Sequence, residues 1–184
     1  MRIAYNAPFV LTFMLTAIAI MAWTNFVNPF FTEQYFTLQP ALNLQDPLFY
    51  FRLFSHVLGH ENWDHLISNG TFILLIGPYL EEKYGSANLL FMSLLTALFT
   101  ALVTILFFPS YLLGASGVVF MMILLGSFTN VKSGYIPLTF ILILFLFLGN
   151  EILKSFQQDN ISQLAHIVGG ICGSIFGFVL NKRR

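Results

Sequence analysis

Charged residues are scarce in this chain of 184 residues. Only 9% are Asp, Glu, Lys or Arg, whereas 57% are hydrophobic and 22 are Phe. A water-soluble domain of this size could not bury that much apolar surface, so the composition predicts an integral membrane protein. The formal net charge is zero and no glycine-rich phosphate-binding pattern is present. We therefore expect a protein whose partner is the lipid bilayer and that binds no nucleic acid.

Cysteine is almost absent as well. The single Cys172 cannot form an intramolecular disulfide. Because it lies in a glycine-rich apolar segment, we interpret it as a small packing residue rather than a reactive thiol.

Breaks that are charged or rich in Pro and Gly divide the chain into six apolar segments. They cover residues 7–27, 61–80, 87–107, 115–131, 135–153 and 164–181. Most reach the ~20 residues that a helix needs to cross a bilayer, although the fourth is shorter. The first could be a cleaved signal peptide, but its length and single Arg2 favour a retained helix. The sequence thus predicts an all-α polytopic membrane protein: one domain over residues 1–184, a six-helix bundle with an outer loop at 28–60 and no separate soluble domain.

The positive charges predict an orientation. With both termini in the cytoplasm, six Lys and Arg residues face inward and only Arg52 and Lys154 face outward. The inward set is Arg2, Lys83, Lys132, Lys182, Arg183 and Arg184. In this arrangement the second, fourth and sixth helices all run from outside to inside.

Four polar residues then fall at one depth. Ser116 and His166 each lie sixteen residues before the Lys that ends their segment, roughly 24 Å above the inner surface. His65 and Asn69 bracket that level on the second helix and share one face, because they are four residues apart. Single polar groups in membranes often only hydrogen-bond between helices. Four at one level instead favour a catalytic site in the outer half of the bilayer.

The fourth segment is too short to cross the hydrocarbon core, so we expect it to begin below the outer surface with Ser116 in its first turn. Backbone at that depth must be buried by protein or reached by water. A water-filled depression above Ser116 would meet this need and would also provide the water that a hydrolase consumes. Gly114, Ala115 and Gly117 leave room around the hydroxyl. The free N–H groups of a first helical turn also favour a developing anion.

These residue types suit nucleophilic catalysis. His166 can take the proton of Ser116 and later protonate the leaving amine. The Ser116 backbone N–H, Asn69 and His65 can donate hydrogen bonds to the oxyanion. No carboxylate is expected at this level, so we predict a Ser–His dyad rather than a triad. The acidic residues placed nearer the outer boundary are Glu61, Asp64, Glu151 and Asp159.

Three short motifs resemble the rhomboid family of intramembrane serine proteases, in the compact six-helix form found in bacteria. They are His65-x-x-x-Asn69, Gly114-x-Ser116-Gly117 and Ala165-His166-x-x-Gly169. The resemblance implies a serine endopeptidase that cleaves transmembrane or membrane-anchored protein substrates near the outer face, through an acyl-enzyme. It implies Ser116 and His166 as the dyad, His65 and Asn69 in the oxyanion hole, a bacterial inner-membrane location, and no metal or organic cofactor. No feature of the sequence specifies an oligomeric state.

The chain departs from the family pattern at two positions. Phe51 precedes Arg52 where many members have Trp, and Phe120 stands where many have a Tyr that stacks on the catalytic histidine. Stacking can survive this change, but a hydroxyl hydrogen bond cannot. On the sixth segment Gly169, Gly173 and Gly177 recur every four residues, which predicts close approach to a neighbouring helix. We expect that neighbour to be the fourth helix, because the dyad requires the two helices to touch.

Two other classes remain open. An intramembrane zinc protease could use His56, His60 and His65, but the His-Glu-x-x-x-His spacing is one residue longer than the zincin motif. On the serine-protease interpretation His56 and His60 lie nearer the outer boundary and should tolerate substitution better than His65 and Asn69. A small transporter or channel would also place polar residues at mid-depth, but we find neither a continuous charged path nor a repeat between the two halves.

Overall fold

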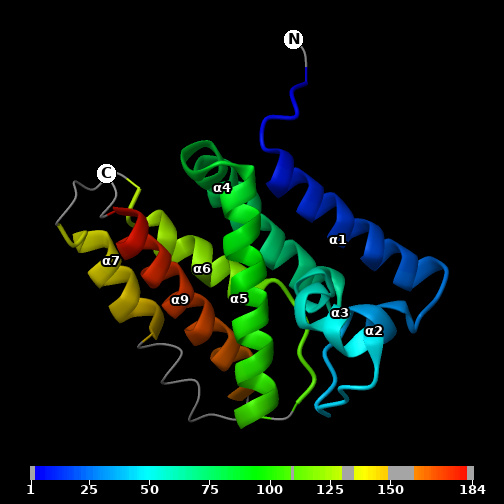
Figure 1. Ribbon diagram of the computed structural model, residues 1–184. Helices are drawn as coiled ribbons and strands as arrows, with labels where there is room; N and C mark the ends of the chain where they lie inside the picture. The colour runs from blue at the N-terminus through cyan, green and yellow to red at the C-terminus, as the bar shows by residue number, and fades with distance from the viewer. Residues whose placement is uncertain (1–2, 109, 130–134, 149–159, 182–184) are drawn as a thin grey trace.

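The computed structural model describes residues 3–108, 110–129, 135–148 and 160–181. These residues are mainly helical, and within them the only β pairing is an isolated bridge between Leu38 and Leu112. The larger elements are α1 (Pro8–Phe26), α4 (Trp63–Tyr84), α5 (Ser86–Phe107), α6 (Ser116–Gly126), α7 (Leu138–Ile143), its π-helical continuation η2 (Leu144–Leu148), and α9 (Asn160–Asn181) (Figure 1).

The helices pack around α6. Helix α6 has its closest neighbours in α9, α4 and α5, and it runs in the same direction as α4 and α9 (Figure 1). Helix α1 packs mainly on α4 and lies on the side of the bundle opposite α7. The four polar residues can lie at one depth only if α4, α6 and α9 run in the same direction, as they do here.

Within the described residues, three stretches are long and apolar enough to cross a membrane unaided: α1, α5 and residues 163–180 of α9. Helix α6 is apolar but has only 11 residues, a length of roughly 16 Å against a ~30 Å hydrocarbon core. The all-helical architecture agrees with the sequence, and the count of six membrane spans stays a prediction.

The predicted fourth helix is shorter than expected, because its end is capped. It was expected to reach residue 131, yet α6 ends at Gly126. The hydroxyl of Thr129 donates to the Gly126 carbonyl over 2.7 Å, and the Lys83 ammonium donates to the carbonyls of Phe128 (3.2 Å) and Thr129. These donors satisfy carbonyl groups that a continuing helix would have used. The fifth helix was expected over 135–153; it begins at Leu138, and residues 149–153 lie outside the described part of the chain.

The segment predicted as an outer loop, residues 28–60 and called the outer segment below, is largely helical. It contains α2 (Phe31–Phe36), α3 (Pro47–Ser55) and the 3-10 turn η1 (His56–Leu58). Asp46 caps α3 by accepting from the Leu48 N–H at 2.9 Å, and Pro47 occupies the first helical position. The buried Arg52 donates to the Gln34 carbonyl at 2.9 Å through Nε and pairs with Asp46 at 3.2 Å. These bonds hold the segment together at one end of the bundle.

At the opposite end, Glu81 joins three helices. Its buried carboxylate accepts from the N–H groups of Phe9 (2.7 Å) and Val10 (3.0 Å) and from the Ser86 hydroxyl (2.6 Å). Glu81 thereby satisfies unpaired N–H donors at the start of α1. Negative charge is favourable there, because it lies at the N-terminal end of that helix. The contact fixes the height of α4 in the bundle, and with it the level of the residues at the other end of α4.

Candidate active site

The interface between α6 and α9 depends on glycine. A Cβ atom added at Gly169 would overlap the backbone of Gly117, and one at Gly173 would overlap the backbone of Met121. The two helices therefore touch backbone to backbone, which only glycine permits at these positions. This close approach brings the start of α6 beside the first half of α9, where Ser116 and His166 lie.

A tight turn positions Ser116 at the first residue of α6. Gly114 has φ +116°, a conformation that side chains other than glycine rarely adopt, and its N–H donates to the His56 carbonyl at 2.9 Å. A Cβ at Gly114 would lie 2.7 Å from Cε1 of His65, so glycine also leaves space for that imidazole. Gly114 thus sets both the direction of the chain before Ser116 and the place of His65.

The four polar residues predicted from the sequence line one cavity. Ser116, His166, His65 and Asn69 all contribute to a space of about 450 Å³ between α4, α6 and α9. Three of these residues are half-buried, whereas Asn69 is buried. The cavity wall contains further polar residues, so water and a peptide bond can both be accommodated.

The imidazole of His166 is stacked on a ring from α6. The ring centroids of Phe120 and His166 are 4.2 Å apart and the planes differ by 11°. Phe120 lies one turn after Ser116, so the same helix that carries the hydroxyl also supports the imidazole. The stack predicted to survive the Tyr-to-Phe difference is present.

Asn69 offers a donor toward the cavity. Its Nδ2 atom is buried and has no hydrogen-bond partner within the described residues. An orphaned buried donor is costly unless a ligand or reaction intermediate completes it. The amide group is therefore well suited to stabilise negative charge that develops next to Ser116.

His56 and His60 are more deeply enclosed than expected. Both are buried, with 1% and 3% of their surface exposed. Burial lowers the pKa of His56 to about 4, while burial and then the neighbouring His65 lower the pKa of His60 to about 4. The His60 ring meets the His65 ring edge-on with centroids 5.1 Å apart. That cleavage tolerates substitution better at these two positions than at His65 and Asn69 stays a prediction.

Within the described residues, His56, His60 and His65 do not form the zinc site that the sequence left open. Nδ1 of His56 lies 3.1 Å from the Arg52 carbonyl and Nδ1 of His60 lies 3.3 Å from the Leu58 carbonyl. In the described ranges no group of three or more His, Cys, Asp or Glu side chains could hold a metal ion.

Three polar residues of the cavity wall were not assigned to the site from the sequence: Glu61, Ser68 and Tyr111. Ser68 could have been found, because it lies three residues after His65 and so shares its helix face. Glu61 had been placed nearer the outer boundary, yet it lines the cavity from the position just before the Asn62 cap of α4. No sequence pattern could have placed Tyr111 in the cavity wall, since its position depends on the bridge between Leu38 and Leu112.

Comparison with known proteins defines the class. The family model described as Rhomboid domain matches residues 48–183, and the chain belongs to the rhomboid family. The chain is 25% identical over 178 residues to Rhomboid protease GlpG of Haemophilus influenzae, covering 95% of this chain and 92% of that protein. It is 30% identical over 138 residues to Putative rhomboid protease YdcA of Bacillus subtilis, covering 72% of this chain and 66% of that protein.

A plant relative is similar over a shorter part of its length. Rhomboid-like protein 11, chloroplastic, of Arabidopsis thaliana is 26% identical over 139 residues, which cover 67% of this chain and 50% of that protein. That match covers half of the plant protein, whereas the match to the Haemophilus protein covers nearly all of that protein. Family membership, together with the long apolar helices, identifies the chain as a membrane protein.

Proposed function

We propose that this protein is an intramembrane serine endopeptidase that cleaves transmembrane or membrane-anchored proteins. The observation that supports this most strongly is the single cavity shared by Ser116, His166, His65 and Asn69 in a chain of the rhomboid family. Two of its relatives are named as proteases or putative proteases. No cofactor is needed for the reaction that these groups can perform.

The first half of the reaction forms an acyl-enzyme. The Ser116 Oγ attacks the scissile carbonyl carbon while His166 takes the hydroxyl proton. The oxyanion receives hydrogen bonds from Asn69, His65 and the Ser116 backbone N–H. The C–N bond then breaks as His166 gives the same proton to the leaving nitrogen, which departs as an amine.

The second half consumes water. Water attacks the acyl carbon, His166 accepts its proton, and the ester bond breaks when that proton returns to Ser116 Oγ. A carboxyl product leaves and the free hydroxyl is restored. An imidazole must be held in one orientation for this, a role that a carboxylate has in a triad. The stack of Phe120 on His166 supports that orientation here.

We further propose that cleavage occurs toward the outer face of a bacterial inner membrane, with both termini in the cytoplasm. The support is the distribution of Lys and Arg along the chain. The short α6 then begins inside the bilayer, with Ser116 accessible from the outer side.

Labelling with a fluorophosphonate tests the proposal. Purified protein in detergent should gain one adduct, located at Ser116 by mass spectrometry. Ser116→Ala and His166→Ala should each lower peptide cleavage by a factor on the order of 10³ or more, and the double variant should be no worse because the two act as a unit. Ser68→Ala removes the other serine hydroxyl of the cavity and should keep the adduct. An adduct elsewhere, or substantial cleavage by Ser116→Ala, would refute the serine mechanism.

A further inference from the structure

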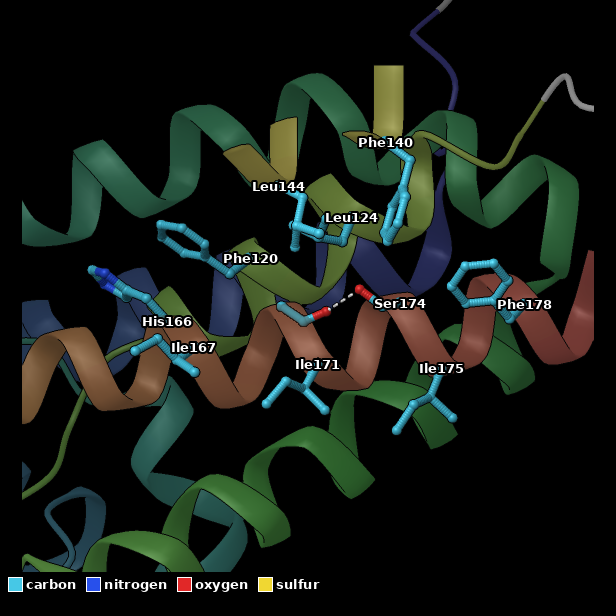
Figure 2. A pocket seen from close by; sticks show the side chains of 11 residues that line it. Phe120, Leu124, Phe140, Leu144, His166, Ile167, Ile171, Ser174, Ile175 and Phe178 are labelled. Atoms are coloured by element: carbon cyan, nitrogen blue, oxygen red, sulfur yellow. Dashed lines mark hydrogen bonds between the residues drawn. The ribbon is translucent and has the colours of Figure 1, made fainter. Parts of the chain in front are cut away.

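A second cavity lies beside the first and shares two residues with it. It has a volume of about 340 Å³ and is enclosed by α6, by α7 with η2, and by α9. Phe120 and His166 stand at one end of it, while Phe178 stands at the other (Figure 2). The twelve residue-to-residue steps from His166 to Phe178 correspond to roughly 18 Å along α9. The cavity is therefore long and narrow, and it begins at the stacked pair.

The wall of this cavity offers almost no polar group. Apart from His166 at the end, its side chains are aliphatic or phenyl except for Ser174, whose hydroxyl donates to the Gly170 carbonyl at 2.7 Å (Figure 2). The neighbouring catalytic cavity, by contrast, has Glu61, Ser68 and Asn69 in its wall. A polar ligand would lose hydration here without compensation, whereas an apolar chain would lose nothing.

The cavity is also continuous with the surface that faces lipid. Ile171 and Ile175 line it, and 53% and 54% of their surface is exposed. Both lie within residues 163–180 of α9, a stretch apolar enough to cross the membrane. In a bilayer, the molecules next to this opening would be lipid acyl chains, whose apolar chemistry matches the wall.

We propose that this cavity is a binding site for one lipid acyl chain. A substrate side chain fits the position less well, because Ser116, His65 and Asn69 are not part of this wall. A bound chain would contact Phe120 and His166 and so hold the stacked pair in place. This second part, the coupling to Ser116 reactivity, rests on the proposed function, whereas the binding site itself does not.

Photocrosslinking tests the site. The full chain is reconstituted in phosphatidylcholine nanodiscs that contain a small fraction of phosphatidylcholine with a diazirine near the end of one acyl chain. After irradiation, mass spectrometry should find adducts on Ile167, Ile171 and Leu144 at least fivefold above those on Leu15, an exposed residue of α1. Equal labelling at both places would overturn the proposal. So would adducts that arise only from a diazirine placed in a transmembrane substrate peptide.

A pair of glycine variants sharpens the test. A Cβ at Gly170 would meet only Leu124 carbons, at 3.8 and 4.0 Å, so Gly170→Leu can fill the cavity without backbone strain. It should reduce the cavity adducts at least fivefold, and Ser174→Val provides a second filling variant. The control is Gly126→Leu, where a Cβ would meet Ile76 at 3.6 Å in the groove between α4, α6 and α7. Cavity adducts should persist in that control, and their persistence in both filled variants would contradict the site.

The rate of fluorophosphonate labelling measures the coupling. Wild-type Ser116 should react at least threefold faster in long-chain lipid than in a short-chain detergent. In Gly170→Leu the leucine side chain itself fills the cavity, so the labelling rate of Ser116 should no longer depend on the lipid. A wild-type rate that does not change would refute the coupling. A complete lack of labelling at Ser116 would instead refute the proposed function and leave the crosslinking result standing.

Discussion

The two sides of α6 are built differently. On the α9 side, glycine at positions 169 and 173 lets the backbones meet. On the α7 side, contact is made by side chains: Phe140 of α7 packs with Phe128, just after α6, and with Phe178 of α9, with ring centroids 4.8 to 5.5 Å apart. Cavities of about 340 and 770 Å³ also border α7. One side of α6 is thus fixed by backbone contact, and the other is held by adjustable side chains.

This difference follows the division of roles. The residues that we assign to the chemistry come from α4, α6 and α9, whereas no described residue of α7 lines the catalytic cavity. A catalytic pair needs constant geometry, and glycine contact supplies it. A helix that borders the site through side chains can change access without moving the pair. Changes on the fixed side should therefore alter turnover or folding, and changes at the border should have smaller effects.

After Ser116 and His166 themselves, the largest effect on the fixed side should come from Asn69. Asn69→Ala removes the buried donor that has no partner in the described part of the chain, so kcat should fall by a factor of about 10²–10³ while KM changes little. Asn69→Asp keeps the shape but removes the N–H groups, and it should be equally impaired. Asn88→Ala, at an exposed site near the other end of α4, is the control. Wild-type turnover in Asn69→Ala would remove this residue from the oxyanion hole.

The stability of the segment that carries His56 and His60, next to His65 of the site, should be sensitive to acid. His56 and His60 have a folded pKa of about 4 against about 6.5 when unfolded, so between these values the unfolded chain binds more protons. Stability should be constant above pH 7, fall as the pH drops from 6.5 to 4, and lose about 3 kcal/mol for each histidine. Thermal unfolding in a nonionic detergent at several pH values measures this. His56→Asn should remove about half of the dependence, and a melting temperature that rises toward pH 4 would contradict the assignment.

The glycine contact itself can be broken at one position and spared at the next. A methyl group at Gly169 would press on the Gly117 backbone, so Gly169→Ala should destabilise the protein by about 1–3 kcal/mol and reduce labelling of Ser116. At Gly170 a methyl group makes only ordinary contacts, and Gly170→Ala should be neutral or slightly stabilising. The melting temperatures of the two variants, measured together, decide the matter. Equal values would mean that the backbone contact does not hold the helices.

The sequence was sufficient to predict the fixed side but not its surroundings. Ser116, His166, His65 and Asn69 could be placed at one level because helix rise converts residue number into depth. The shared cavity agrees with that register. The expected pairing of Ser116 with His166 indicated α6 as the neighbour of α9, and the glycine contacts place α9 against it. The early end of α6 could not be foreseen, since Lys83, far away in sequence, caps it. The burial of His60 and the position of Tyr111 likewise depend on how the outer segment folds over the site.

The smallest predicted effect lies at the border between the two sides, at Phe120. Its ring supports His166 on the catalytic side and lines the apolar cavity toward α7. Stacking of aromatic rings contributes about 0.5–1.5 kcal/mol, so Phe120→Leu should lower kcat/KM by about two- to tenfold. Phe120→Tyr keeps the ring and should stay within about twofold of the wild type. The pH profile of kcat/KM distinguishes support of the imidazole from simple packing, because only a change at His166 shifts the acidic limb. If Phe120→Leu matched the wild type in both rate and profile, the orientation of His166 would have to come from α9 alone.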